Sequence, residues 1–411
     1  MKVNPDQILI SGAGPAGAFA SMYLSYYQIP HTLVDKSHFP RDKICGDAIS
    51  GKVINLLANF DESLVKELSD SSQAFTTNGI YFFSPSGKKI ELPFPQASGK
   101  YPPGFVQKRV SFDNFLVNQI DEDYCRFIGG TRINGLQNSP EGNLVELKDG
   151  KQSYKINPDL IIGADGAQSV IRRSLFPDNS KINKSAGLRL YARNVEPAPN
   201  SSYIELHFLK NVMPGYFWIF PLGNGDYNIG LGMHEKRVKK HKINLKNLLK
   251  EVLEKHPEVS GRFTNFSEED QIRGWSLPMY GRNMQMTRNG VMLTGDAANL
   301  IDPFTGEGIA PAMLSGKLAA LKAMEGLKAE RFDHKFLKSY EDELFSKIKD
   351  EMRISYWLQQ ITFYPRLLQF MMDKVSHSKE FQNSLYRMFT DMEERKKILN
   401  PLKYVKFLTK H

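Results

Sequence analysis

The chain opens with short apolar runs that alternate with a helical pattern. Ile8-Leu9-Ile10-Ser11 predicts a short buried strand, residues 18–27 continue with helical spacing, and His31-Thr32-Leu33-Val34 predicts a second strand. Far downstream, residues 290–294 predict another strand, and residues 310–326, rich in Ala, Leu and Met, predict a long buried helix. Strands that alternate with helices in this way predict an α/β fold with a parallel sheet.

The turn between the first strand and its helix has GxGxxG spacing. Its residues are Gly12, Ala13, Gly14, Pro15, Ala16 and Gly17. Gly12 permits the tight turn, Gly14 lets the backbone approach a pyrophosphate at the positive helix end, and Gly17 lets helix and strand pack closely. Asp35, which ends the second strand, can accept a hydrogen bond from a ribose hydroxyl, and we include its neighbour Lys36 in the cofactor set. The pattern predicts a dinucleotide site and fits NAD and FAD equally.

A second glycine-rich stretch follows the strand at residues 290–294. It reads Gly295-Asp296-Ala297-Ala298 and continues to Pro303-Phe304-Thr305-Gly306-Glu307-Gly308-Ile309. Gly306, Gly308 and Ile309 are expected to begin the following helix, whose positive end would face an anionic ligand. In a flavin enzyme such a helix end stabilises negative charge on the reduced ring, and Asp296 can bind the ribityl or pyrophosphate region. A capped structural helix is the alternative.

Five segments in this order resemble the geranylgeranyl reductase family of FAD enzymes, within the p-hydroxybenzoate hydroxylase-like flavoproteins. They are GAGPAGA (12–18), FPRDKICGD (39–47), VQKRVSFDNFL (106–116), GADGAQSVIRR (163–173) and GDAANLIDPFTGEGIAPAM (295–313). The resemblance implies FAD as cofactor and a Rossmann-like FAD-binding domain with an inserted antiparallel β-sheet substrate domain and C-terminal helices. NAD(P)H is expected only as a transient electron donor, because the sequence has no second complete GxGxxG unit.

The resemblance adds six residues to the expected cofactor set: Arg41, Cys45, Gly46, Arg109, Asp165 and Gly166. The two arginines are expected to contact pyrophosphate or ribityl oxygens, with an ion pair at the surface as the alternative. The loop of Cys45 and Gly46 is expected near the flavin ring. Asp165 and Gly166 follow a strand predicted at residues 160–164, and this element serves FAD and the nicotinamide donor in hydroxylase relatives.

The narrower family resemblance rests on one further segment, a YxWxFP sequence followed by GxG. Tyr216, Trp218 and Phe220 alternate along a predicted strand, and Gly230 and Gly232 follow them. Alternation places the three rings on one face, as an apolar wall suited to a long hydrocarbon substrate. An ordinary sheet core is the alternative. Flavin halogenases carry a WxWxIP sequence instead, so the halogenase interpretation is disfavoured.

The resemblance and the pattern together predict three parts. A discontinuous FAD-binding domain is expected at residues 1–75, 105–180 and 273–330, with a substrate domain at residues 76–104 and 181–272. The substrate domain is expected to be an antiparallel sheet, because its segments alternate apolar and polar residues between turns. Residues 331–411 are expected to be helical, interrupted at Pro365 and Pro401.

Composition and charge limit the partners, the bound groups and the cellular location that we expect. The 411 residues carry a formal net charge of +9, and only two cysteines occur, without metal-binding spacing, so neither a disulfide framework nor a metal site is expected. No helix-turn-helix, zinc-finger or RNP pattern accompanies the basic residues, which argues against nucleic acid. We expect neither a secretory signal nor a spanning helix, since no apolar run is long enough. A cytoplasmic protein is expected, with transient contact at the inner face of the membrane; the oligomeric state stays open.

The functional expectation is reduction of carbon–carbon double bonds in a prenyl or other lipid-like substrate by hydride from flavin N5. One alternative is an aromatic or polyketide monooxygenase that uses NAD(P)H and oxygen, because the same FAD motifs serve both classes. The other is an electron-transfer flavoprotein that acts on a quinone. No catalytic proton donor is assigned: Glu205 and His207 share a strand face upstream of the aromatic segment, but an exposed strand pair explains them equally well.

Overall fold

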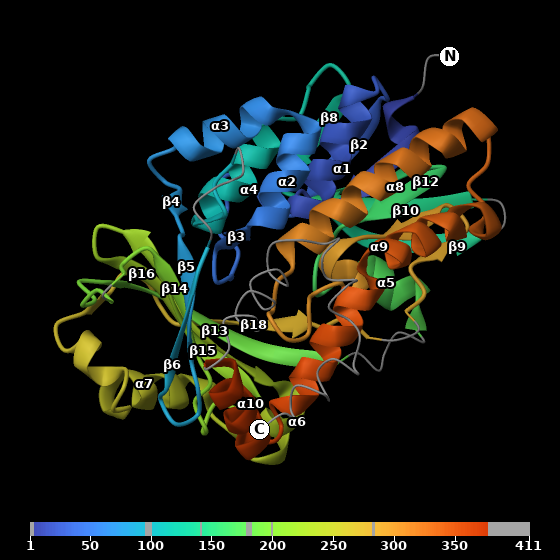
Figure 1. Cartoon of the computed structure of the whole chain (residues 1–411). Coiled ribbons are helices and arrows are strands. Elements are labelled where there is room, and N and C mark those ends of the chain that lie inside the picture. The colour runs from blue at the N-terminus through green and yellow to red at the C-terminus, as the bar shows by residue number, and fades with distance from the viewer. Residues whose placement is uncertain are drawn as a thin grey trace. The chain divides into compact units, whose positions relative to one another are not determined.

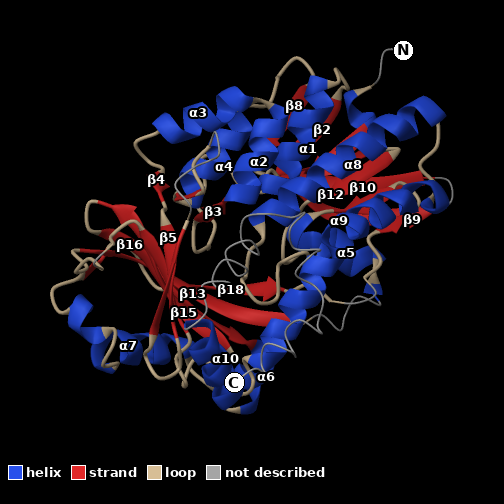
Figure 2. Ribbon diagram, in the orientation of Figure 1, coloured by secondary structure: helices blue, strands red, loops and turns tan. Residues whose placement is uncertain are grey.

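The computed structural model describes residues 4–94, 101–139, 142–177, 183–198, 200–281 and 284–376. Figures 1 and 2 show the course of the chain and its helices and strands. It forms two compact units: unit 1 comprises Met1–Lys43, Arg109–Asn183 and Leu277–Lys349, and unit 2 comprises Ile44–Lys108, Lys184–Ser276 and Asp350–His411. The sequence predicts that residues 44–75 belong to the FAD-binding domain, but these residues lie in unit 2. The division into an FAD-binding domain, a substrate domain and a helical region therefore stays a prediction.

Unit 1 is built on a six-stranded sheet in the order β19–β20–β12–β1–β2–β8. The strands are β1 (Ile8–Ser11), β2 (His31–Asp35), β8 (Cys125–Gly129), β12 (Leu160–Gly163), β19 (Thr287–Arg288) and β20 (Val291–Leu293). The strands from β20 to β8 run parallel, and β19 pairs antiparallel at one edge. Every residue of β1, β2 and β12 is buried, as is typical of parallel strands covered on both faces. The predicted α/β fold is confirmed.

Helix α1 (Pro15–Tyr26) follows β1 after the glycine turn and packs against helix α8 (Ile309–Ala329). The close contact requires a small residue, because a Cβ on Gly316 would lie 2.1 Å from the carbonyl oxygen of Ala16. As a result, the two helices approach each other near the first turn of α1. The other short helices of unit 1 are η1 (Pro5–Gln7), α4 (Arg109–Asn118), α5 (Val170–Leu175) and η4 (Gly295–Ala298).

Between β8 and β12, the chain forms a separate three-stranded antiparallel sheet that the sequence analysis does not anticipate. Its strands are β9 (Thr131–Ser139), β10 (Gly142–Asp149) and β11 (Gln152–Ile156). Val145 and Leu147 of β10 are fully buried, whereas most of β11 is exposed. Such half-buried alternation is typical of an antiparallel sheet with one solvated face.

Unit 2 contains an eight-stranded sheet in the order β17–β13–β16–β15–β14–β5–β6, with β18 also paired to β13. The strands are β5 (Gly79–Phe83), β6 (Lys89–Pro93), β13 (Lys184–Arg193), β14 (Tyr203–His207), β15 (Gly215–Gly223), β16 (Asp226–His234), β17 (Ser267–Glu268) and β18 (Arg273–Pro278). The predicted antiparallel character is confirmed for its central strands, and β14 and β5 form a parallel pair within it. A small sheet β3–β7–β4 (Ala48–Ser50, Gly104–Val106, Phe75–Thr76) accompanies it.

One face of the large sheet is closed by a hydrophobic core. Phe217 and Ile219 of β15 and Leu231 of β16 pack with Leu249 and Val252 of helix α7 (Leu245–Lys255), and all five are at most 1% exposed. Because side chains alternate along a strand, the neighbouring positions of β15 face the other side of the sheet. The remaining helices in this part of the chain are α2 (Gly51–Phe60), α3 (Glu62–Asp70), α6 (Glu235–Lys240) and η3 (Ser260–Phe263).

Among the described residues, two helices follow α8: α9 (His334–Ile361) and α10 (Pro365–Ser376). The predicted helical character of this region is confirmed up to residue 376, and the predicted interruption lies directly before Pro365. Proline fits the first turn of a helix because its missing N–H has no partner to lose there. Pro401 lies outside the described residues. Within the described ranges, none of the helices has the length and apolar character needed to cross a bilayer.

Candidate functional site

The glycine turn of unit 1 has the backbone geometry that its sequence predicts. Gly12 has a φ of +101°, and a Cβ there would lie 2.3 Å from the carbonyl oxygen of Ala164, so only glycine fits. Gly14 is the N-cap of α1, Pro15 begins the helix, and no side chain caps it. The first backbone N–H groups of α1 therefore keep their capacity to bind an anion.

Asp35 lies beside this turn. Its Oδ2 accepts a hydrogen bond from the Ala13 N–H at 2.8 Å, and its Oδ1 accepts one from the Ser37 N–H at 2.9 Å. The carboxylate is thus held at the carboxyl end of β2, next to the turn that follows β1. The sequence predicts this proximity, because both groups lie at the ends of neighbouring parallel strands.

Two predicted arginines meet at one buried carboxylate, Asp113 of α4. Arg109 donates to Asp113 from Nε at 2.6 Å and from Nη2 at 2.8 Å, and Arg41 donates to it from Nη1 at 2.7 Å. Asp113 is fully buried, so both ion pairs are well shielded from water. The second amino nitrogen of Arg41 lies 3.5 Å from the position of a Cβ on Gly14, which places this guanidinium beside the glycine turn.

Asp165 and Gly166 follow β12 and connect it to α5. Asp165 Oδ2 accepts hydrogen bonds from the Val170 and Ile171 N–H groups at 2.7 and 3.3 Å. Its Oδ1 is buried and has no hydrogen-bond partner among the described residues. Burial raises the pKa of Asp165 above its ordinary value, even though these backbone hydrogen bonds act in the opposite direction. The carboxyl therefore has one oxygen that still lacks a donor.

The second glycine-rich stretch forms the start of α8. Gly308 is the N-cap, without a side-chain capping hydrogen bond, and a Cβ on it would lie 3.4 Å from Asp296 Oδ1. Asp302 organises the preceding turn by accepting hydrogen bonds from the Phe304 and Thr305 N–H groups at 2.9 and 2.8 Å. Asp296 thus lies at an uncapped helix end, and α8 begins with Ile309 just after Gly306 and Gly308.

An arginine that the sequence analysis does not single out joins these elements. Arg172 of α5 donates from Nη1 to the carbonyl oxygens of Asp296 and Ala297 and to Asn299 Oδ1, each at 2.9 Å. Asn299 adopts a left-handed conformation that ends η4. Arg172 belongs to the GADGAQSVIRR segment, so the resemblance could have identified it.

In unit 2, the predicted aromatic residues of β15 lie next to one another on one side of the sheet. The ring centroids of Tyr216 and Trp218 are 6.2 Å apart, and those of Trp218 and Phe220 are 6.3 Å apart. Leu206 of β14 pairs with Trp218, and Phe82 of β5 pairs with Leu206, so both extend the same apolar face. We name this face, formed by these five residues, the aromatic face.

The loop of Cys45 and Gly46 packs directly on the aromatic face. A Cβ on Gly46 would lie 3.0 Å from the Phe220 ring and 3.7 Å from Trp218 Nε1. Asn228 Nδ2 donates to the Cys45 carbonyl oxygen at 2.8 Å and to Asp47 Oδ2 at 2.7 Å. The structure therefore brings a predicted cofactor loop and the predicted substrate residues together within unit 2.

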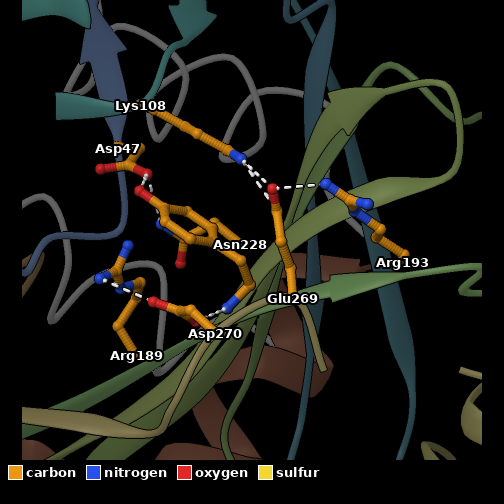
Figure 3. Close-up of polar contacts among 8 residues, drawn as sticks. Asp47, Lys108, Arg189, Arg193, Asn228, Glu269 and Asp270 are labelled. Atoms are coloured by element: carbon orange, nitrogen blue, oxygen red, sulfur yellow. Dashed lines mark hydrogen bonds and ion pairs between the residues drawn. The ribbon is translucent and has the colours of Figure 1, made fainter. Parts of the chain in front are cut away.

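A buried polar network holds this loop, and its centre is Asp47. Asp47 Oδ2 accepts hydrogen bonds from Tyr191 Oη at 2.6 Å and from Asn228, and Asn228 Oδ1 accepts one from Trp218 Nε1 at 2.9 Å. Asp47 and Asn228 are both fully buried. We name Asp47, Tyr191, Asn228 and the Trp218 indole nitrogen the Asp47 network; Figure 3 shows its surroundings.

Two cations flank the Tyr191 ring of this network. Lys108 Nζ lies 4.5 Å from the ring centroid, and Arg189 Cζ lies 3.8 Å from it. Glu269 pairs with Lys108, and Asp270 pairs with Arg189 at 3.2 Å, as Figure 3 shows. Burial opposes ionisation of Glu269, but its hydrogen bonds from Lys108 and Arg193 outweigh this effect and lower its pKa.

Glu205 and His207 lie on the other side of the sheet. Their antiparallel partners on β15 are Ile219 and Phe217, which belong to the hydrophobic core. Glu205 accepts a hydrogen bond from Arg262, and this pair together with His207 holds the Glu205 pKa below its ordinary value despite burial. The two residues are buried rather than an exposed strand pair, and they do not contribute to the aromatic face.

The sequence alone does not predict the Asp47 network. Asp47 ends the FPRDKICGD segment, so the family resemblance could have identified it. Tyr191 and Asn228 belong to no motif and become neighbours only because β13 pairs with β16. In the described part of the chain, no group of three or more His, Cys, Asp or Glu residues could hold a metal ion.

Comparisons with known proteins identify the family of the chain. The model of the FAD-binding domain family matches residues 6–350. The chain belongs to this family and is an FAD-dependent oxidoreductase. The two uncapped helix starts, the Asp35 carboxylate and the unpaired oxygen of Asp165 in unit 1 suit the polar groups of FAD.

More particular similarities point to one branch of these enzymes. Digeranylgeranylglycerophospholipid reductase of Methanosarcina acetivorans is 28% identical over 331 residues, which is 78% of this chain and 76% of that protein. A solved geranylgeranyl bacteriochlorophyll reductase-like protein from Thermoplasma acidophilum matches with a TM-score of 0.79 at 22% identity, covering 96% and 98% of the two chains. A flavin-dependent brominase matches with a TM-score of 0.76 at 16% identity, covering 97% and 98%. At these identities, the two solved structures show a shared fold alone.

Proposed function

We propose that this oxidoreductase reduces carbon–carbon double bonds of a prenyl or other lipid-like substrate. The observation that carries the proposal is the aromatic face, on which Tyr216, Trp218 and Phe220 lie together with aliphatic neighbours. The names of the sequence relatives, digeranylgeranylglycerophospholipid reductases, support the same substrate class. The distant brominase match does not favour halogenation, because the YxWxFP sequence departs from the halogenase pattern.

For the cofactor, we propose that the glycine turn and the start of α8 hold FAD. The backbone N–H groups of Gly14, Ala16 and Gly17 would face the pyrophosphate, with Pro15 starting the helix beside them, and Asp35 would face the ribose. Arg41, Arg109 and Asp296 are proposed to position polar parts of the same molecule, and the Gly306–Ile309 segment is proposed to face the flavin ring. Lys36, Cys45, Gly46, Asp165 and Gly166 complete the proposed set.

Bound FAD, once reduced by an electron donor, would supply a hydride to one carbon of the double bond and return to its oxidised form, and a proton would complete the neighbouring carbon. The protein's part is to bind the hydrocarbon and exclude water. The indole N–H of Trp218 is occupied by Asn228, so the Trp218 ring offers an apolar surface without an unsatisfied donor. The Asp47 network also holds a proton at Tyr191 Oη in this environment.

Steady-state kinetics of two variants tests the aromatic face. Trp218→Ala removes a ring from the proposed binding surface and should raise KM for a polyprenyl substrate at least about tenfold, with FAD content unchanged. Phe217→Leu, a neighbouring change on the core face, should lower the free energy of unfolding without altering KM. Equal KM values for wild type and Trp218→Ala would show that Trp218 is only part of a sheet core.

We further propose that NAD(P)H reduces the enzyme transiently and that the protein works in the cytoplasm, at the inner face of the membrane. A lipid substrate supports this location, because it is dissolved in the bilayer. An aromatic monooxygenase and a quinone-linked electron carrier are the competing functions. The product distinguishes these functions from the proposed one. A monooxygenase would give an oxygenated aromatic compound, and an electron carrier would give a reduced quinone.

A further inference from the structure

The end of α9 and the outer side of α10 expose an unusual amount of apolar surface. Five large side chains of this segment are exposed: Trp357 (68%), Phe363 (38%), Tyr364 (65%), Leu367 (45%) and Phe370 (47%). Among the described residues, the other exposed large hydrophobics are Tyr26 and Tyr27 in unit 1. Contiguous exposed apolar patches are rare on monomeric proteins and usually mark an interaction site.

This exposure does not result from a loosely packed helix. Leu368 and Met372 on the inner side of α10 are 7% and 8% exposed. Gln369 Oε1 accepts a hydrogen bond from the Ser86 N–H at 2.8 Å, and Asp373 pairs with Lys88 at 3.7 Å. Helix α10 is therefore fixed to the hairpin of β5 and β6 by one face, while its opposite face presents Leu367 and Phe370 outward.

Basic residues surround the apolar segment. The ring of His234, the N-cap of α6, lies 5.2 Å from the ring of Phe363, so α6 is a direct neighbour of the turn before α10. Lys236, Lys239 and Lys240 of α6 are exposed, as is Arg366 of α10. Glu235 offsets only one of these charges, through its pair with Lys239. Lys374 also lies over the Phe370 ring at 5.8 Å.

From this juxtaposition, we propose that the five exposed side chains and the α6 lysines form a docking surface for an anionic lipid bilayer. Aromatic and aliphatic side chains enter the interface between headgroups and acyl chains, while lysines and arginines pair with anionic headgroups. The proposal rests on the proposed function for its biological purpose, because a bilayer would hold the lipid substrate. The surface itself is defined by exposure and charge in unit 2.

Vesicle flotation of the full-length protein tests the apolar part. Wild type should float with vesicles of phosphatidylcholine and phosphatidylglycerol and remain unbound with pure phosphatidylcholine. The double variant Leu367→Gln and Phe370→Gln should reduce partitioning at least about tenfold, since it removes two inserting side chains. The matched control, Tyr26→Gln and Tyr27→Gln, should float like wild type. Equal flotation of the Leu367/Phe370 variant and wild type would overturn the proposal.

Charge reversal tests the basic part. Lys236→Glu and Lys240→Glu together should weaken binding to anionic vesicles more than about twentyfold, because each lysine near such a surface contributes about fivefold. The control is Lys151→Glu with Lys155→Glu, exposed residues of unit 1 in the turn before β11 and in β11 itself, which should bind like wild type. Binding that is insensitive to the α6 reversal and to 0.5 M salt would contradict an electrostatic contact.

The fluorescence of Trp357 reports contact directly. Anionic vesicles should shift the wild-type emission to shorter wavelength, and this shift should be absent from Trp357→Phe, which leaves Trp218 and Trp275 as the remaining tryptophans. Sedimentation velocity of wild type and the Leu367/Phe370 variant tests the alternative that a second copy of the chain covers this surface. A wild-type dimer that the variant abolishes, together with no vesicle shift, would assign the surface to a second copy and overturn the proposal.

Activity measurements keep this inference separate from the proposed function. Reduction of a detergent-dispersed polyprenyl lipid needs no bilayer, so the Leu367/Phe370 variant should retain wild-type turnover and FAD content in detergent. Flotation without any polyprenyl reduction would refute the proposed function and leave the docking surface standing. Polyprenyl reduction by a protein that never binds anionic vesicles would refute the docking surface alone.

Discussion

The glycine turn of unit 1 and the Asp47 network of unit 2 organise their surroundings by different physical means. Gly12 acts through backbone sterics, because no other residue fits a φ of +101° against the Ala164 carbonyl. The Asp47 network acts through side chains that are distant in sequence: Tyr191 and Asn228 donate to the buried Asp47 carboxylate, and Trp218 donates to Asn228. A backbone constraint is local in sequence and can be predicted, whereas a network of side chains depends on strand pairing.

The largest expected effect on cofactor binding comes from adding one carbon to the glycine turn. Gly12→Ala places a Cβ 2.3 Å from a carbonyl oxygen at a positive φ, so the turn must move. We expect FAD affinity to fall at least about a hundredfold, measured by titrating the apoprotein with FAD. Gly261→Ala is the control, because a Cβ there meets no atom within 4 Å. Unchanged FAD affinity in Gly12→Ala would refute the steric account of this turn.

A second change compares a buried ion-pair centre with an exposed one. Asp113→Ala leaves Arg41 and Arg109 without their buried carboxylate, and we expect it to lower the free energy of unfolding by about 3–5 kcal/mol. Asp373→Ala removes the exposed partner of Lys88 and should cost less than about 1 kcal/mol. Urea unfolding of both variants measures the difference. Similar losses for the two would show that the Asp113 centre is not effectively buried.

The pH dependence of stability sharpens the comparison, because unit 1 also contains a buried histidine in β2. Burial lowers the pKa of His31 to about 4, against an ordinary value of 6.5, despite its hydrogen bond to the Ile29 carbonyl. The neutral ring is therefore favoured in the folded state. Its stabilisation is complete above pH 6.5 and is lost as the pH falls towards 4, by about 3 kcal/mol.

The measurement is urea unfolding between pH 7.5 and 4, with His31→Gln compared with wild type. The variant should show a shallower loss of stability over this range, and His38→Gln, a change at an exposed position, should follow the wild-type curve. Parallel curves for His31→Gln and wild type would contradict a lowered His31 pKa.

The smallest effect is expected in the Asp47 network. Tyr191→Phe removes one hydrogen bond to Asp47 and keeps the ring between Lys108 and Arg189. The free energy of unfolding should fall by about 1–2 kcal/mol, because Asp47 retains its bond from Asn228. FAD affinity should stay within about twofold of wild type. A large loss of FAD in this variant would show that the network serves the cofactor rather than the aromatic face.

The extent to which the site could be predicted follows the same division. The strand, turn and helix at residues 8–26 were predictable because sterics and apolar patterning act locally. The polar partners Tyr191 and Asn228 were not, because the pairing of β13 with β16 sets their proximity. Strand register also decides that Glu205 faces the core while Trp218 faces the opposite side. Alternation predicts which residues share a face but not which face meets a helix.

The most direct test of the proposed reduction is an anaerobic single turnover. Enzyme reduced with dithionite, freed of excess reductant and mixed with a polyprenyl lipid should be reoxidised without oxygen, as followed by flavin absorbance. Mass spectrometry should find the lipid heavier by two hydrogens for each double bond reduced. Reoxidation only after oxygen is admitted, with an aromatic substrate heavier by one oxygen atom, would contradict the reductase account and establish a monooxygenase.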